Sequence, residues 1–211
     1  MPPANLRRRR ALADAAITLL AQEGAHGLSH RAVETLAGVP AGTATNYFRK
    51  REALLIAAAE RIIELHLAET ATVALRDDGP GGEAETPRAA GPDELADLLT
   101  GSLWTAATAL RARYMAAFEL LLEARRRPPL AAALAGLEDT AFVSTARLHA
   151  EFRTALPETA IRTLIALYTG TLFTLVALPA ESLDKAAVRP LAEAMVRGAF
   201  ATGASRGVSV E

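Results

Sequence analysis

A short run of hydrogen-bonding side chains near the amino end has the composition of a helix that reads base pairs. Four side chains in the segment 41–48 carry hydroxyl or amide groups: Thr43, Thr45, Asn46 and Tyr47. Ala41 and Gly42 precede them and are small enough to let a backbone approach a duplex closely. Ala44 and Phe48 fall on the opposite side, where we expect them to face a core. The chemistry that this pattern favours is noncovalent contact with base edges and phosphates in a major groove.

Basic side chains flank this segment and could supply contacts that do not depend on sequence. Arg31 and Arg51 are placed to lie beside the groove, and Arg7–Arg10 form a run near the amino end. Ser29 is expected at the amino end of a helix, where backbone N–H groups favour an anion such as phosphate. Arginine contacts to phosphate would make binding sensitive to salt. The Arg7–Arg10 run has two interpretations, a flexible solvated tail or an arm in the minor groove.

The charges are unevenly distributed along the chain. Residues 1–51 hold eight Arg and Lys against three acids, a net charge of +5, and residues 52–211 hold fifteen against twenty-one, a net of −6. The sum is the net −1 of the 211-residue chain. A basic end on an acidic body indicates that the amino end meets a polyanion.

Three helices joined by tight turns are expected to position these side chains. Leu12, Ala16, Leu19 and Leu20 form one apolar helical face, and Gly24 is placed to end that helix. Ser29 is a suitable N-cap for a second helix, whose buried stripe is predicted to be Val33, Leu36 and Ala37. Gly38 would supply a positive φ before Pro40, and the third helix would run from Ala41 to Tyr47 or Phe48. This arrangement is a helix-turn-helix.

The rest of the chain also has helical periodicity. A long amphipathic helix is predicted over 52–75, and the Gly- and Pro-rich segment 76–93 is predicted to be a flexible loop. Five helical stretches follow, and we expect them near 94–110, 111–126, 130–154, 158–178 and 183–201. The chain is therefore predicted to be all-α, with an N-terminal helix-turn-helix DNA-binding domain followed by a C-terminal helical ligand-binding and dimerisation domain.

One uncharged stretch, Thr163–Ala180, is close to the length of a membrane span. Its four threonines, Gly170 near the middle and Pro179 at the end favour a soluble helix buried on most of its faces. No apolar segment of the signal-peptide type follows the amino end, and we expect a cytoplasmic protein.

No catalytic motif competes with DNA binding. The sequence has no Gly-rich phosphate loop, no G-x-S-x-G motif and no Cys, and its four His are scattered. We therefore expect neither an enzyme nor a metal site nor a cofactor.

The amino-terminal third resembles the tetracycline-repressor-like (TetR) transcriptional regulators. The resemblance rests on Ala37-Gly38-Val39, Gly42-Thr43, Tyr47-Phe48 and Glu52-x-Leu54-Leu55, after the Ser29 cap, and covers about residues 6–56. The chain departs from the family pattern where Thr45 replaces an aromatic residue and Pro40 replaces a Ser or Thr. Arg51 stands where the family has Lys and keeps the charge.

The resemblance implies a two-fold dimer on a palindromic operator, with a small-molecule pocket in the carboxyl-terminal half. The domains would be 1–51 for DNA binding, 52–75 as a connecting helix, 76–93 as a loop and 94–211 for effector binding and dimerisation. The candidate dimer seam is Gly170, Leu172, Leu175, Val176, Leu191, Met195 and Ala199; burial of these residues within one monomer is the alternative. The pocket candidates, each of which could instead be ordinary core, are Trp104, Tyr114, Met115, Phe118, Phe142, His149, Phe152 and Tyr168.

The sequence as a whole indicates a homodimeric repressor that a small-molecule effector releases from its operator. The effector would favour a conformer in which the two reading helices no longer match successive major grooves. Two alternatives stay open. One is an activating or ligand-independent regulator, and the other is an all-helical enzyme or adaptor with a vestigial helix-turn-helix.

Overall fold

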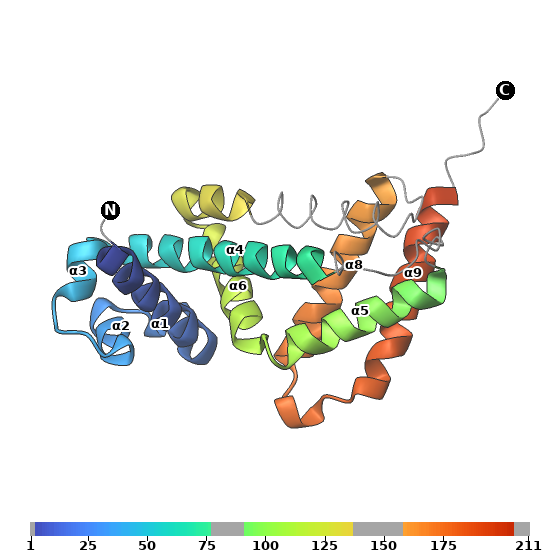
Figure 1. The fold of residues 1–211 in the computed structure, drawn as a ribbon, viewed down its shortest axis with the longest axis horizontal. Helices are drawn as coiled ribbons and strands as arrows, with labels where there is room; N and C mark the ends of the chain where they lie inside the picture. Colours follow the sequence, from blue (N-terminus) through green and yellow to red (C-terminus); the bar gives the residue numbers. More distant parts are fainter. Residues whose placement is uncertain (1–2, 77–90, 137–157, 205–211) are drawn as a thin grey trace. The chain divides into compact units, whose positions relative to one another are not determined.

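The computed structural model describes residues 3–76, 91–136 and 158–204, and these residues form helices and connecting turns without a strand (Figure 1). Residues 128–136 are also helical. The main helices are α1 (Pro3–Gly27), α2 (His30–Ala37), α3 (Thr43–Tyr47), α4 (Arg51–Arg76), α5 (Pro92–Ala107), α6 (Arg111–Ala124), α8 (Glu158–Ala177) and α9 (Lys185–Ala204). A 3₁₀ turn, η1 (Ala180–Ser182), precedes α9. The predicted all-α fold is confirmed.

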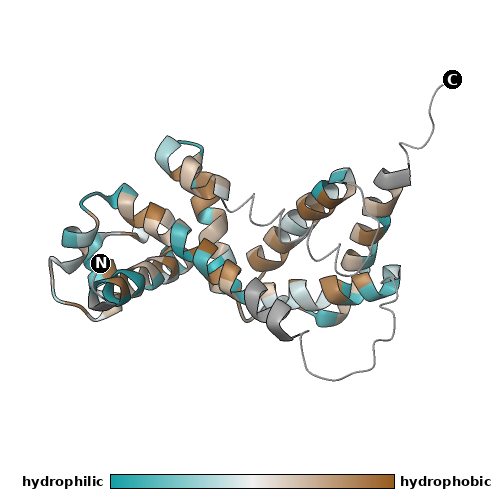
Figure 2. Ribbon diagram, turned by 45° about the horizontal axis from the view of Figure 1, so that its top comes forward, coloured by the Kyte–Doolittle hydropathy of each residue, from teal (hydrophilic) through white to brown (hydrophobic). Residues whose placement is uncertain are grey.

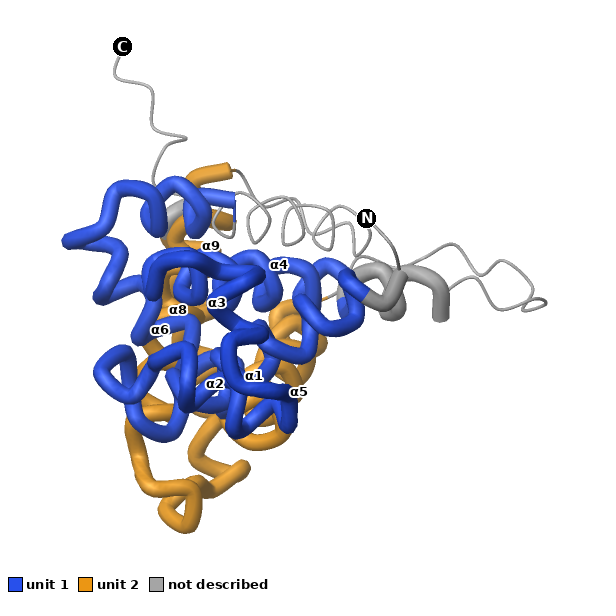
Figure 3. Tube along the Cα trace, turned by 90° about the vertical axis from the view of Figure 1, so that its left-hand side faces the viewer, with its two compact units in different colours: residues 1–73, 112–138 blue, residues 74–111, 139–211 orange. Residues whose placement is uncertain are grey.

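The chain divides into two compact units (Figure 3). The first unit contains residues 1–73 and 112–138, and the second contains residues 74–111 and 139–211. This division differs from the domain boundaries expected from sequence, because α6 belongs to the first unit although it lies within 94–211. Its residues Ala116, Ala117 and Leu120 are buried in the same core as α1 and α4.

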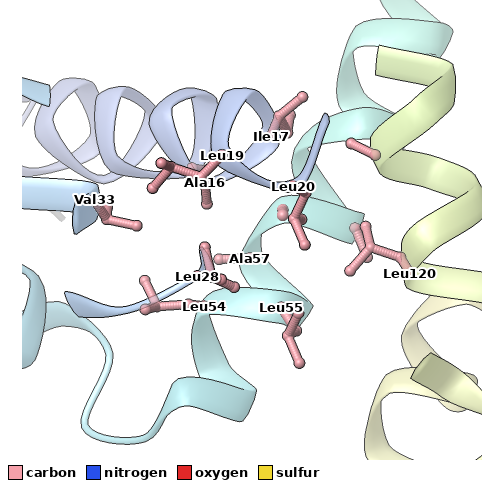
Figure 4. Close-up of a cluster of buried hydrophobic side chains, with 14 of the residues drawn as sticks. Ala16, Ile17, Leu19, Leu20, Leu28, Val33, Leu54, Leu55, Ala57 and Leu120 are labelled. Atoms are coloured by element: carbon pink, nitrogen blue, oxygen red, sulfur yellow. The ribbon is translucent and has the colours of Figure 1, made fainter. Parts of the chain in front are cut away.

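Leucine and alanine side chains build the core of the first unit. Leu12 and Leu20 of α1, Leu54 and Leu55 of α4 and Leu120 of α6 are at most 1% exposed. Figure 4 shows labelled side chains of this core, which come from α1, α2, α4, α6 and the segment between α1 and α2. Burial of one such side chain contributes about 1.5–3 kcal/mol, so this core can hold the short helices α2 and α3 in place. Hydrophilic and hydrophobic residues are mixed along the helices of the chain (Figure 2).

Capping residues define the turn between α2 and α3. The Ser29 side chain accepts a hydrogen bond from the Ala32 N–H at 3.2 Å, which confirms the predicted N-cap. Gly38 ends α2 with φ 63° and ψ 35°, which confirms the predicted positive φ. Gly42 also has a positive φ, of 83°, and directly precedes α3. A side chain at Gly38 or Gly42 would be strained whatever space surrounds it.

Several local expectations need correction. Helix α3 begins at Thr43 rather than Ala41, because Gly42 is left-handed and cannot be a helical residue. Helix α1 is interrupted at Gly24 (φ 66°, ψ −172°), where the sequence predicted its end, and one more helical turn follows this kink to Gly27. Leu36 is 47% exposed, whereas Glu34 is buried in its place on the inner side of α2.

The Arg7–Arg10 run is helical and lies within α1, so it is neither a flexible tail nor an extended arm. Of the residues predicted as loop, Arg76 belongs to α4 and α5 begins at Pro92, while 77–90 lie outside the described residues. The predicted helix 130–154 is observed only in its first part, because 137–157 also lie outside them.

Helices α5, α8 and α9 pack against one another in the second unit. Leu95 and Ala96 of α5 pack with Val196 of α9. Arg111 donates hydrogen bonds to the carbonyl oxygens of Leu175 (3.3 Å) and Leu178, so a guanidinium satisfies the carboxyl end of α8.

Helix α8 is the one described helix that is long and apolar enough to cross a membrane, judged by length and composition. A core helix of a soluble protein meets the same criteria. In the single chain, 33% of the most apolar 18-residue window of α8 is buried. The prediction that this helix is buried on most of its faces is therefore not met by one chain alone.

Candidate nucleic-acid interface

Helix α3 presents a polar face outward and an apolar face inward. Thr45 and Asn46 are exposed, and so are Ala41 and Gly42 in the turn before the helix. Ala44 is fully buried, and Phe48 after the helix is 3% exposed, so both point into the core as predicted. The exposed face therefore offers one hydroxyl and one amide to an external partner, with small residues beside them.

Two of the predicted contact residues also bind within the chain. The Thr43 hydroxyl donates a hydrogen bond to the Pro40 carbonyl oxygen at 2.6 Å. The Tyr47 hydroxyl donates to Oδ1 of Asn5 at 3.2 Å, which ties α3 to the first turns of α1. Both side chains are half-buried, so they orient α3 in addition to any contact that they make outside the chain.

Two side chains of α2 that the sequence did not single out contact the two ends of α3. The Glu34 carboxylate accepts a hydrogen bond from the Ala44 N–H at 2.7 Å, and the Glu34 residue is only 6% exposed. His30 Nε2 lies 2.5 Å from the Phe48 carbonyl oxygen. A carbonyl oxygen can only accept, so Nε2 carries the hydrogen in this contact. The sequence signal that could have pointed to these two residues is their spacing: His30 and Glu34 are four residues apart, so they lie on one face of α2.

The flanking basic side chains differ in what they contact. Ser29, Arg31, Arg49 and Lys50 are exposed. Arg51 is half-buried, and its guanidinium donates to the carbonyl oxygens of residues 28 (2.8 Å) and 25. Arg51 therefore joins the start of α4 to the segment between α1 and α2. A contact between Arg51 and a DNA phosphate remains a prediction, in addition to this structural role.

Ion pairs connect the Arg7–Arg10 run to α4. Arg9 pairs with Glu60 at 3.0 Å, and its guanidinium lies 5.5 Å from the centre of the Phe48 ring. Arg10 pairs with Glu64, which also accepts from Arg61 at 2.8 Å. The Arg61 guanidinium holds the pKa of the Glu64 carboxyl below its usual value.

Arg61 also pairs with Asp14 at 2.7 Å, so three acids on α1 and α4 are paired with three arginines. Arg7 and Arg8 are exposed on the outer side of the same helix. Because the run is helical, Arg9 and Arg10 form ion pairs with α4, whereas Arg7 and Arg8 face outward.

The predicted pocket residues fall in both units. Tyr114, Met115 and Phe118 are half-buried in the first unit, and Trp104 and Tyr168 are half-buried in the second. The Ser102 and Tyr168 hydroxyls are hydrogen-bonded at 2.8 Å. Burial raises the pKa of the Tyr114 hydroxyl. The remaining candidates, Phe142, His149 and Phe152, lie outside the described residues.

The residues predicted for the dimer seam separate into two groups. Five of them are buried within the single chain: Leu172, Leu175, Val176, Met195 and Ala199. Residues at most 6% exposed in one chain have little surface left to offer a second copy. Gly170 and Leu191 are exposed, and a Cβ added at Gly170 would meet no atom within 4 Å.

Two family models match the chain on either side of the connecting helix. Residues 12–58 match the model for bacterial regulatory proteins of the tetR family, and residues 90–202 match the tetracyclin repressor-like C-terminal domain. A search of curated proteins finds no significant match.

Solved structures share the fold over most of the chain. A protein of Mesorhizobium loti MAFF303099 assigned to the TetR-family transcriptional regulators has a TM-score of 0.72 at 18% identity, over 95% of this chain and 98% of that one. A transcriptional regulator of Rhodococcus sp. Rha1 has a TM-score of 0.70 at 18% identity, over 92% and 96%. The multidrug binding protein EbrR, complexed with ethidium, has a TM-score of 0.58 at 29% identity, over 89% and 98%.

The helix-turn-helix with an outward polar face on α3 places the protein among DNA-binding transcription regulators. With both family models matched, the chain belongs to the TetR family, as the sequence resemblance indicated. Members of this family are regulators and generally not enzymes.

Proposed function

We propose that the protein is a homodimeric repressor that binds a palindromic operator and is released by a small-molecule effector. The observation that carries the proposal is the outward face of α3, where Thr45 and Asn46 are exposed while Ala44 is fully buried. Exposed Arg31, Arg49 and Lys50 close to this helix in sequence supply phosphate contacts. A DNA-binding regulator of this kind acts in the bacterial cytoplasm.

An apolar outer surface on α8 and α9 supports the dimer. Leu167 of α8 and Leu178, directly after α8, are 39% and 41% exposed, and Leu191 of α9 is 42% exposed. Gly170 lies between Leu167 and Leu178 in the sequence and leaves room for a second helix to approach closely. A two-fold axis through this surface would pair α8 and α9 with their copies, so that two α3 helices reach successive major grooves about 34–36 Å apart.

The effector is proposed to bind among the aromatic side chains of the carboxyl-terminal helices. EbrR has been crystallised with ethidium and with proflavin, which shows that this related protein holds planar aromatic cations. For this chain the absence of charged side chains from residue 163 to the end of α8, together with the half-buried Trp104 and Tyr168, favours an apolar or weakly polar ligand.

Selection from a random duplex library tests the proposal. The wild-type protein is expected to enrich a palindromic duplex, to sediment as a dimer, and to release that duplex when an uncharged aromatic compound that does not intercalate into DNA is titrated. Transcription from a reporter behind the enriched duplex should fall when the protein is present. Enrichment without release by any ligand would favour a ligand-independent regulator, increased reporter output would favour an activator, and no enrichment at low salt would exclude the DNA-binding function.

A further inference from the structure

Helix α3 is too short to be stable or oriented by itself. It has five residues, fewer than the roughly 12–15 that an isolated helix needs in water. Its only fully buried side chain is Ala44, a single methyl group. Apolar contact of this size is not directional, so the rotation of α3 about its own axis must be fixed by other contacts.

The contacts from α2 match the two ends of α3 in register. Glu34 accepts from the Ala44 N–H, and His30 contacts the Phe48 carbonyl oxygen. His30 and Glu34 are four residues apart, and so are Ala44 and Phe48, so each pair is separated by about one helical turn. The two contacts therefore hold both ends of one short helix from one face of its neighbour.

The chemistry of each contact suits its end of the helix. The first N–H groups of a helix have no partner within it, and Gly42 before α3 has no side chain to provide one. The buried Glu34 carboxylate accepts one of these N–H groups and faces the positive end of the helix dipole. At the other end, His30 donates to a carbonyl oxygen that follows the helix.

We propose that Glu34 and His30 are positioning residues that set the orientation of α3 and thereby the sequence discrimination of the protein. They act through the α3 backbone, because the buried Glu34 accepts from the Ala44 N–H and His30 contacts the Phe48 carbonyl oxygen. This inference rests on the proposed DNA-reading role of α3. It adds that the discrimination is controlled from α2, by residues outside the set that contacts bases.

The test compares specific and non-specific binding of full-length variants. The probes are the duplex that the wild type enriches from a random library and a shuffled duplex of the same composition. Glu34→Ala is expected to weaken binding to the enriched duplex by about tenfold or more, since a hydrogen bond to a charged group is lost. Binding to the shuffled duplex should stay within about twofold, because it depends on arginine contacts to phosphate.

Three further variants separate positioning from general destabilisation. Glu34→Gln keeps an acceptor oxygen and should recover most of the discrimination. His30→Ala should lower the discrimination between the two duplexes, as Glu34→Ala does. Thr35→Ala, at an exposed site on α2, should leave this discrimination unchanged. Equal loss on both duplexes, or no recovery with Glu34→Gln, would overturn the inference.

Amide hydrogen exchange tests the same contacts in the absence of DNA. The Ala44 amide should exchange faster in Glu34→Ala, while the amides of Leu54 and Leu55 in the core keep their protection. Unchanged exchange at Ala44 would overturn the inference even if binding changed. If the wild type enriched no duplex, the proposed function would fail, and exchange at Ala44 would still show whether Glu34 holds α3.

Discussion

Helices α3 and α8 are held by opposite kinds of contact and face outward with opposite chemistry. Helix α3 has five residues, is oriented by hydrogen bonds to Glu34, His30 and Asn5, and presents Thr45 and Asn46 outward. Helix α8 has twenty residues, buries apolar side chains within the second unit, and still exposes Leu167 and Phe173. A polar outward face suits a hydrated polyanion, and an apolar outward face suits a second copy of the chain.

Ionisable groups of the two units lie in different surroundings. In the first unit, burial lowers the pKa of His66 and raises that of Tyr114, and arginine partners lower the pKa of Glu64 and Glu123. In the second unit, the pKa of Arg189 is raised by the carboxylates of Glu193 and Asp97. The first unit therefore holds half-buried ionisable side chains beside its core of leucine and alanine.

The largest expected effect comes from a charge on the outer face of α8. Gly170→Glu places a carboxylate where a Cβ meets no neighbouring atom, so the monomer should fold normally. If this face pairs two copies, sedimentation should show a monomer, and affinity for the enriched duplex should fall by about 100-fold as the second half-site is lost. The matched control is Gly101→Glu on α5, which also has open space at its Cβ and should remain dimeric.

A Gly170→Glu protein that stays dimeric with wild-type affinity would place the dimer interface elsewhere. The exposure of Leu167 on α8 would then need another explanation, while the interpretation of α3 would be unaffected.

The second effect is on base discrimination by α3. Asn46→Ala removes an exposed amide and should weaken binding to the enriched duplex by about 1–3 kcal/mol, with little change on a shuffled duplex. Lys50→Ala should instead weaken binding to both duplexes. It should also make the dependence of affinity on salt concentration shallower, by the amount expected for about one lost phosphate contact. Fluorescence anisotropy at several salt concentrations measures both. Equal losses on both duplexes for Asn46→Ala would show that this side chain does not read bases.

The sequence predicted the polar face of α3 but not how it is oriented. Ser29, Gly38, Ala44 and Phe48 follow local rules of capping, turn geometry and helical periodicity, and the structure confirms each of them. The role of Glu34 depends on the Ala44 N–H ten residues away, after a turn with two left-handed glycines, and no local pattern encodes that distance.

The outward face of α8 was harder to predict for a related reason. Helix α8 is apolar around much of its circumference, so periodicity alone cannot show which stripe faces its own chain. The structure assigns Leu172, Leu175 and Val176 to the interior and leaves Leu167 and Gly170 outside.

A third effect tests the structural role of Arg51. Arg51→Ala removes a guanidinium that donates to the carbonyl oxygens of residues 28 and 25, and should lower the free energy of unfolding by about 2 kcal/mol. The exposed Arg49→Ala, two residues away, is the control and should change stability by less than about 0.5 kcal/mol. Urea denaturation measures both, and equal stability of the two variants would show that these hydrogen bonds contribute nothing net.

The smallest effect concerns a half-buried histidine of the first unit. Burial lowers the pKa of His66, so the folded protein holds this proton less tightly than the unfolded chain does. As pH falls below the usual His value of about 6.5, the unfolded chain takes up the proton first and the folded state loses stability. His66→Gln cannot titrate and should lose less stability between pH 7.5 and pH 5.5.

Urea midpoints at pH 7.5 and pH 5.5 measure this difference, and the pH range is chosen to exclude the carboxylates. The pKa values of Glu64 and Glu123 are lowered by their arginine partners, so the stability that these groups contribute is lost only as pH falls below about 4.5. A wild-type protein that loses no more stability than His66→Gln would show that the site of His66 does not disfavour its charged form. The burial of His66 in the first unit would then make no contribution to the pH dependence of stability.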